Sequence, residues 1–567
     1  MPYRSPVADI TFVLDKIVDF ASLTGTDRFA ETTPDVTEAI LSEAGRMCDE
    51  VLAPLNRAGD LHPAVLENGV VRTSPGFADG YRAIAEGGWI GMAANPDHGG
   101  MGLPQTLATA VNDMMSGACR ALQLNPLMSQ GQIEALEHHA SDEIKALYLP
   151  KLISGEWHGT MNLTEPQAGS DVGALRTKAE PLADGTYAIT GQKIFISWAD
   201  NDFIANTCHL VLARLPDGVA GTKGISLFMV PKLIPDAEGN PGERNLLRVV
   251  SLEHKMGLHG SPTAVMAFEG AKGWLVGKPH GGMAAMFTMM NNARLGVGVQ
   301  GLGVAEAAYQ KAVEYAQERR QGRVGGTGTI SEYPDVRRML MTMKGDIFTA
   351  RSIALDCAVA IDMATATGDA RWSARAALLT PIAKAFGTDT GIEVSQMGMQ
   401  VHGGMGYIEE TGAAQFLRDV RVTAIYEGTN GIQAMDLVGR KMMDGGEAAF
   451  RLLDEIEANA EAARGAHPDL AEAVWNAAES LREATEWMVA QTDMNDRFAG
   501  AVPYLRAFAR VLGAHYHLMA AQTGDAARTA LAAFTIRRIL PEHQALLAHA
   551  MSGAAGLVDI PLEDLGL

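Results

Sequence analysis

The sequence predicts a multidomain α+β protein: an N-terminal helical domain, a middle antiparallel β domain, a four-helix bundle and an additional C-terminal helical domain. Three observations lead to this fold class. Apolar residues recur at helical spacing up to about residue 160, short alternating runs replace them up to about residue 280, and long helical patterns fill the rest. We therefore expect domains at 1–160, 161–280, 281–445 and 446–567.

Composition and charge narrow the class of protein. The chain has 567 residues, of which 47% are hydrophobic, and a net charge of −21. An acidic surface repels nucleic acid, so we expect no nucleic-acid partner. No uncharged stretch is long enough to cross a bilayer, and the four cysteines are scattered without paired spacing. We expect a cytoplasmic protein with reduced thiols, no membrane segment and no metal site.

The first 160 residues carry the helical period. Ile10, Leu14 and Ile17 lie at helical spacing with polar residues between them, and Ile40 and Ala44 repeat the pattern. This region is predicted to be helical throughout, apart from a glycine-rich connection.

The period changes after about residue 160. Short, partly alternating runs are separated by turn signals such as Asp184-Gly185, a pattern typical of an antiparallel barrel or sandwich. The expected strands are 187–190, 193–197, 209–213, 224–230 and 264–268.

Helices return after about residue 281. Long apolar-rich patterns predict helices over 286–317, 333–366 and 374–400, and a further helix follows Glu427 as far as Met443. Together they suggest a four-helix bundle. The last segment, 446–567, is alanine-rich, helical and acidic, which argues against a nucleic-acid module.

One loop of this region has the character of a catalytic site. Glu427 follows a short apolar run, and a poorly solvated carboxylate has a raised pKa and is a stronger base. Gly428 allows close approach to the backbone, and Thr429 can cap a helix whose N-terminus could hold a phosphate. The alternative is an ordinary loop glutamate in front of a helix.

Three other segments carry groups that could line a cofactor. Segment 161–171 offers hydroxyls, glycine and backbone amides, segment 193–198 offers Phe195 for stacking and Ser197 as a donor, and segment 400–407 is a glycine-rich turn. Each has a plain structural alternative, namely an interdomain loop, core packing and a helix C-cap.

Taken together, these motifs resemble the acyl-CoA dehydrogenase family over about residues 35 to 445. The resemblance lies in the order and spacing of Thr164-Glu165-Pro166, Ala168-Gly169-Ser170-Asp171, Gly191-Gln192-Lys193, the 400–407 turn and Tyr426-Glu427-Gly428-Thr429. The C-terminal extension is similar to that of the bacterial branch named for 3-methylmercaptopropionyl-CoA dehydrogenase. Such a resemblance implies α,β-dehydrogenation of an acyl-CoA thioester, of a short or substituted chain, with FAD as cofactor.

The resemblance also implies roles for single residues. Glu427 matches the base that removes the α-proton, and its backbone N–H matches a donor to the thioester carbonyl. The residues matching FAD contacts are Met161, Leu163, Thr164, Gly169, Ser170, Phe195, Ile196, Ser197, Arg319, Gln321, Gln400, Gly403, Gly404, Thr429 and Asn430. The residues matching substrate contacts are Ser170, Asn291, Arg294 and Gly428.

The spacing of two arginines indicates an oligomer. Arg294 matches an arginine near the catalytic carboxylate and Arg319 one that holds FAD phosphate, and they are 319 − 294 = 25 residues apart. On one helix this is about 37 Å. Arg319 is therefore expected to reach the FAD of a neighbouring subunit in a homodimer or homotetramer.

Some positions depart from the family pattern, and two alternatives stay open. Phe195 stands where many members have tryptophan, Gln321 and Gly322 follow the arginine segment without the usual aromatic residue, and Asn291 stands where several members have aspartate. An electron-transfer flavoprotein is the expected electron acceptor. The alternatives are an acyl-CoA oxidase that uses oxygen and a DNA-associated flavoprotein of the same fold.

Overall fold

The computed structural model describes residues 3–322, 326–557 and 559–566. The chain divides into two compact units, one formed by residues 43–293 and the other by residues 3–42 together with 294–566. The boundaries of the four expected domains stay a prediction. None of the helices in these described ranges is long and apolar enough to cross a membrane. All four cysteines are buried.

The helices of the 43–293 unit precede its sheet. They are α4 (Ala53–Leu61), α5 (Phe77–Glu86), α6 (Gln105–His139) and α7 (Asp142–Ile153), and α3 (Pro34–Met47) leads into them. The expectation of an all-helical N-terminal region is wrong at one place, where a hairpin of β1 (Val65–Glu67) and β2 (Val70–Arg72) follows α4. Asn68 and Gly69 both adopt positive φ there, the conformation that a tight hairpin turn requires.

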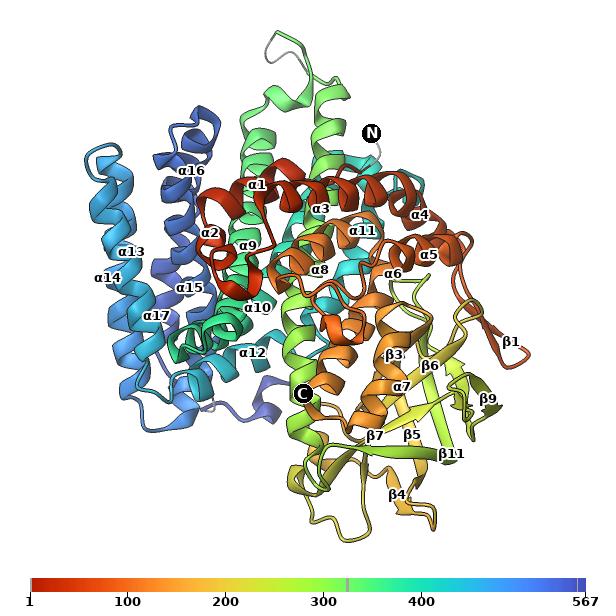
Figure 1. The fold of residues 1–567 in the computed structure, drawn as a ribbon. Coiled ribbons are helices and arrows are strands. Elements are labelled where there is room, and N and C mark those ends of the chain that lie inside the picture. The colour runs from red at the N-terminus through yellow and green to blue at the C-terminus, as the bar shows by residue number, and fades with distance from the viewer. Residues whose placement is uncertain (1–2, 323–325, 558, 567) are drawn as a thin grey trace. The chain divides into compact units, whose positions relative to one another are not determined.

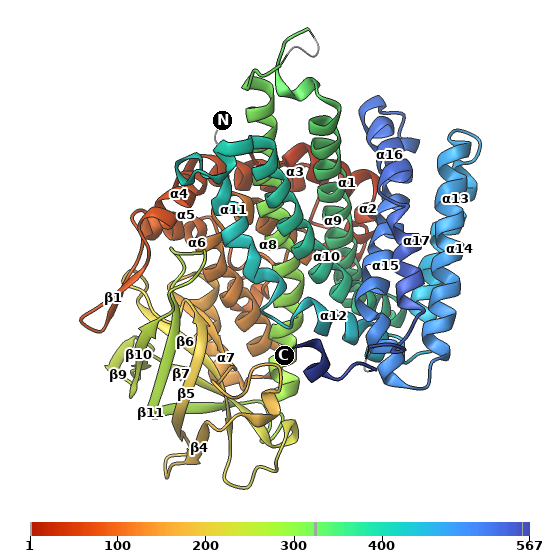
Figure 2. The same ribbon diagram turned by 180° about the vertical axis from the view of Figure 1, so that it is seen from behind.

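Seven strands form the main sheet of this unit in its described part, in the order β10-β11-β5-β4-β6-β3, with β7 pairing with both β11 and β6 (Figure 2). The expected strands fall on β5, β6, β7 and β11, but the runs 187–190 and 193–197, expected as two strands, form the single strand β5. Most pairs are antiparallel, although β3 and β4 pair with β6 in parallel. The inward side chains, among them Ile189, Val211 and Phe228, form one buried core. The strands are β3 (Trp157–Asn162), β4 (Lys178–Pro181), β5 (Tyr187–Ser197), β6 (Asn206–Arg214), β7 (Ile225–Pro231), β10 (Leu247–Leu252) and β11 (Thr263–Val276).

Three long helices form the centre of the other unit. They are α8 (Gly282–Glu318, whose residues from Arg294 onward belong to this unit), α9 (Pro334–Thr367) and α10 (Ala370–His402), as the sequence predicts. The helix after Glu427 is shorter than expected: α12 (Asn430–Asp436) continues only as a wider π-helical turn, Leu437–Lys441. The Thr429 hydroxyl caps α12 by accepting a hydrogen bond from the Ile432 N–H at 3.2 Å.

The C-terminal extension is a set of helices beside this bundle (Figure 1). Within it α13 packs on α14, and α15 packs on α16 and α17, while α15 also contacts α9, α10 and α12. Its helices are interrupted near Pro468, Asp493 and Gly524. The helices are α13 (Glu447–Ala463), α14 (Pro468–Ala490), α15 (Met494–Gln522), α16 (Ala526–Arg538) and α17 (Glu542–Ala550).

Facing glycines let α8 and α10 approach each other more closely than side chains would permit. A Cβ atom on Gly298 would lie 2.5 Å from the carbonyl oxygen of Ala383, and one on Gly301 would lie 2.3 Å from that of Gly387. The obstacle in both cases is backbone, which cannot rotate away as a side chain can. This contact sets the distance between the α8 residues that follow Arg294 and the α10 residues around Lys384.

Substituting Gly301→Ala is expected to destabilise the protein by about 1–3 kcal/mol, because the added methyl must push two helix backbones apart. The measurement is the midpoint of urea unfolding. Gly465→Ala is the matched control, since a Cβ there meets no atom within 4 Å. Equal midpoints for the two variants would contradict the close packing.

Candidate active site

The loop that carries Glu427 is strained and fixed by side chains from two helices. Glu427 has φ +57° and Gly428 has φ +82°, a left-handed conformation that an L-residue rarely adopts. The Gln433 amide on α12 donates to the Glu427 carbonyl at 3.1 Å, and the Lys384 ammonium on α10 donates to the Gly428 carbonyl at 2.9 Å. These hydrogen bonds stabilise the strained backbone conformation of the loop.

The Glu427 carboxyl group is in an environment that favours its neutral form. The residue as a whole is half-buried, yet its carboxyl is largely withdrawn from water. This burial raises the pKa of Glu427 to about 7, although the positive charges of Arg294 and Lys384 lower it. Because the fold favours the neutral acid, ionisation costs folding free energy as pH rises from the ordinary value of 4.5 to about 7.

The backbone of Glu427 is available to a ligand. Among the described residues, no acceptor takes a hydrogen bond from the Glu427 N–H. Peptide N–H groups at such positions can stabilise negative charge that develops on a carbonyl oxygen. The loop therefore presents a weakly solvated carboxyl and an unused donor on the same residue.

Arg294 is a buried cation beside this loop. Its guanidinium donates to the Asp436 carboxylate at 3.1 Å, and its Nε has no hydrogen-bond partner in the part of the chain that the structure describes. Burial lowers the pKa of Arg294, and the charges of Asp436 and Glu427 oppose that effect. The structure thus places Arg294 beside Glu427, and its predicted contact with substrate stays a prediction.

In the 43–293 unit a buried ion pair fixes the loop after β3. The Lys193 ammonium donates to the Glu165 carboxylate and to the Leu163 carbonyl, both at 2.9 Å. Glu165 also accepts from the backbone N–H and the hydroxyl of Thr177, at 3.0 and 2.6 Å. Removing either charge would leave the other buried and unpaired. The pair keeps Thr164 in place at the end of β3.

Phe195 and its neighbours form a candidate flavin-binding surface in the 43–293 unit. Phe195 has φ +61° at a register shift between β5 and β11, and the residue is 58% exposed. An exposed aromatic ring on a strained bulge is consistent with stacking on a flat ligand. Ile196 is buried, whereas Ser197 and Met161 are half-buried. Gly169, Ser170 and Asn291 are exposed, the last on α8.

Other predicted cofactor residues lie at the opposite end of the long helices. Arg319 directly follows α8 and Gly403 follows α10, and stacking of Tyr315 on His402, with ring centroids 4.4 Å apart, shows that these two helix ends meet. From Lys384 to His402 is 402 − 384 = 18 residues, about 27 Å of helix. Arg319, Gln321, Gln400, Gly403 and Gly404 are all exposed, and nothing lies within 4 Å of a Cβ on either glycine.

The structure therefore brings together Glu427, Gly428, Thr429, Asn430 and Arg294, and places the Arg319 and Gly403 segments elsewhere. Sequence reasoning did not single out Lys384, Gln433 or Asp389 as site residues. One signal was present, because Lys384 interrupts an apolar run on a predicted bundle helix. A buried lysine needs partners, and these are here the Gly428 carbonyl and Asn430.

Family models match nearly the whole chain. They are described as the N-terminal domain (residues 34–156), the middle domain (160–271) and the C-terminal domain (280–443) of acyl-CoA dehydrogenase, and an acetyl-CoA dehydrogenase C-terminal-like domain (452–561). The last of these falls on the C-terminal extension.

Characterised relatives agree. The chain is 44% identical to 3-methylmercaptopropionyl-CoA dehydrogenase of Ruegeria pomeroyi, over 89% of this chain and 88% of that protein. It is 36% identical to the broad-specificity linear acyl-CoA dehydrogenase FadE5 of Mycobacterium tuberculosis, over 80% and 78%.

A solved structure shows the same fold. Caenorhabditis elegans ACDH-11, in complex with C11-CoA, superposes with a TM-score of 0.80 at 21% identity, over 94% of this chain and 91% of that one. Bacillus anthracis acyl-CoA dehydrogenase complexed with FAD gives a TM-score of 0.77 at 20% identity, over 100% and 95%. The chain therefore belongs to the acyl-CoA dehydrogenase family, whose members are FAD-dependent oxidoreductases.

Proposed function

We propose that this protein oxidises a short or substituted acyl-CoA thioester, such as 3-(methylthio)propanoyl-CoA, to the 2-enoyl-CoA, with Glu427 as the base. The observation that carries the proposal is the Glu427 loop, with its weakly solvated carboxyl, unused N–H and flanking cations. The choice of acyl group is supported by the relative from Ruegeria pomeroyi and its printed name.

Each group of the loop has a separate part in the reaction. The Glu427 carboxylate accepts the proton from the α-carbon, and a pKa raised from 4.5 to about 7 makes it a stronger base by roughly 3 kcal/mol. Its N–H donates to the thioester carbonyl oxygen and stabilises the negative charge that develops there. FAD, when bound, supplies the acceptor for the hydride that leaves the β-carbon.

The chain's own residues suit FAD. Phe195 offers an exposed ring for stacking, Thr164 and Ser197 offer hydroxyls, and the open glycines at 403 and 404 leave room for a ligand close to the backbone. Arg319 offers a charge for a phosphate. An electron-transfer flavoprotein is the proposed electron acceptor.

The proposed assembly is a homodimer or homotetramer in which Arg319 serves the FAD of a neighbouring subunit. The support is the distance between Arg319 and Arg294 within one chain. Arg319 and the Gly403 segment lie at the shared end of α8 and α10, about 37 Å along α8 from Arg294. One cofactor site could hardly use both ends from the same subunit.

Glu427→Gln is expected to abolish anaerobic bleaching of the flavin band by acyl-CoA, while FAD stays bound, because the amide cannot accept the α-proton. A panel from short to long acyl-CoAs, including 3-(methylthio)propanoyl-CoA, is tested on both forms, and the 2-enoyl product is identified. Bleaching of the variant at the wild-type rate would remove Glu427 from the mechanism.

Mixed dimers test the role of Arg319. If Arg319 acts across subunits, a dimer of one Glu427→Gln chain and one Arg319→Gln chain keeps one complete site and about half of the wild-type activity. The matched control joins a wild-type chain with a chain carrying both substitutions, and it should be inactive. The reverse outcome, with activity only in the control, would place Arg319 in its own subunit's site. Chains with two different affinity tags allow each mixed dimer to be purified.

A further inference from the structure

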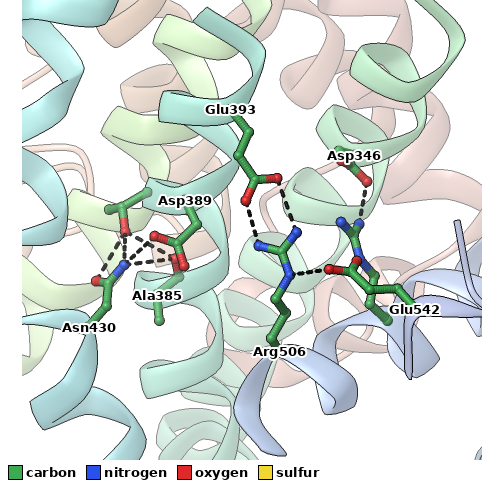
Figure 3. A network of polar contacts seen from close by, with 9 residues as sticks. Asp346, Ala385, Asp389, Glu393, Asn430, Arg506 and Glu542 are labelled. Carbon is green, nitrogen blue, oxygen red and sulfur yellow. Dashed lines mark hydrogen bonds and ion pairs between the residues drawn. The ribbon is translucent and has the colours of Figure 1, made fainter. Parts of the chain in front are cut away.

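The C-terminal extension contacts the bundle through a set of charged groups (Figure 3). Arg506 on α15 donates to both carboxylate oxygens of Glu393 on α10, at 2.5 and 3.2 Å, and to Glu542 at 2.8 Å. The bidentate geometry fixes the direction of Glu393 as well as its distance. Arg510 joins the same cluster by donating to Glu542 at 2.6 Å and to Asp346 at 2.5 Å.

A second group of contacts lies one turn earlier on α10, and among the described residues no hydrogen bond joins it to Glu393. The link is electrostatic: burial raises the pKa of Asp389, the negative charge of Glu393 raises it further, and the charge of Arg506 lowers it. Asp389 lies one helical turn before Glu393, and it accepts a hydrogen bond from the Asn430 amide at 2.7 Å (Figure 3). The Asn430 carbonyl oxygen in turn accepts from the Lys384 ammonium at 2.8 Å. Because a carboxylate stands on one side of the Asn430 amide and an ammonium on the other, only one orientation of the amide satisfies both.

Lys384 is the last member of this series of hydrogen-bonded and charged groups. Its side chain is completely buried, and its ammonium donates to the Gly428 carbonyl at 2.9 Å as well as to Asn430. It thereby holds the peptide that follows Gly428, next to the two residues with left-handed backbone, Glu427 and Gly428. We call Arg506, Glu393, Asp389, Asn430 and Lys384 the relay.

We propose that Lys384 is a positioning residue for Glu427, and that Arg506 of the C-terminal extension steadies it through the relay. The inference rests on the proposed role of Glu427 as the base. It gives the extension a part in the reaction even though none of its own residues is needed at the reacting atoms.

The charges around the loop determine in which direction the pKa of Glu427 shifts when Lys384 is replaced. Burial lowers the pKa of Lys384 to about 8, so it is mostly a cation at neutral pH, and its charge lowers the pKa of Glu427. The other charges facing this pair are Arg294 on α8 and Asp389 on α10. Arg294 keeps its own partner, Asp436, which also pairs with Arg440. Removing the Lys384 charge must therefore raise the pKa of Glu427.

The test follows anaerobic flavin reduction by a saturating acyl-CoA as a function of pH, in the full-length FAD-loaded protein. Lys384→Gln is expected to raise the apparent pKa of the rate by about one unit or more, because an opposite charge at hydrogen-bonding range of the loop is lost. Lys384→Arg keeps the charge and should stay much closer to wild type. A purely structural lysine would show no such rescue of the pH profile.

A second pair of variants tests the part of the extension. Arg506→Gln is expected to slow flavin reduction about threefold at neutral pH and to raise the apparent pKa slightly. Arg482→Gln is the matched control, since Arg482 also binds two carboxylates, Glu457 at 2.9 Å and Asp454 at 2.7 Å, but within α13 and α14. It should leave both quantities unchanged.

The outcomes separate this inference from the proposed function. If wild type is reduced and Glu427→Gln is not, but Lys384→Gln keeps the wild-type pH profile, only the positioning role fails. If Arg506→Gln and Arg482→Gln have the same rate of flavin reduction and the same apparent pKa, the extension has no part in positioning Glu427. A wild type that no acyl-CoA reduces would instead overturn the proposed function itself. Should Lys384→Gln fail to retain FAD, the comparison of Arg506→Gln with Arg482→Gln still decides whether the extension acts on the loop.

Discussion

The arrangement of the site depends on the close approach of α8 and α10. Glycine faces backbone at Gly298 and Gly301, so the two helices run in near contact. Arg294 lies on α8 and Lys384 on α10, and both charges therefore act on the same carboxyl group at Glu427. A bundle held apart by ordinary side chains would weaken both interactions, since the energy between charges falls with distance.

Glu427 combines backbone strain with a controlled charge. The left-handed peptide is held by Gln433 and Lys384, and the same Lys384 limits how far burial can raise the pKa of Glu427. Lys384 thus affects both the position of Glu427 and its strength as a base. Lys384 also donates to Asn430, whose amide donates to Asp389. We therefore expect the position of Lys384 to depend on Asp389, on Glu393 and on the arginine that pairs with Glu393. This is how an extension remote in sequence can influence the loop.

Periodicity and motif order were enough to predict most of the fold and the central carboxylate. The long helices, the strands and Glu427 are local features, visible in a few dozen consecutive residues. The β1–β2 hairpin was missed because its strands are only three residues long. Lys384 was missed for a different reason: its partners Gly428 and Asn430 lie more than forty positions away, and no local pattern encodes that contact. The Glu165–Lys193 pair is likewise a tertiary contact between residues that the motifs named separately.

We infer that the fold raises the pKa of Glu427 so that its carboxylate can accept the α-proton, and infrared difference spectroscopy measures that pKa in the folded protein. The carboxylic-acid C=O band of wild type minus Glu427→Gln is followed across about pH 5 to pH 9, a range that lies above the ordinary pKa of 4.5 and includes the raised one. We predict an acid band at the low end that disappears as pH rises, with its midpoint near the pKa of about 7. A Glu427 carboxylate already ionised at the lowest pH would contradict the account.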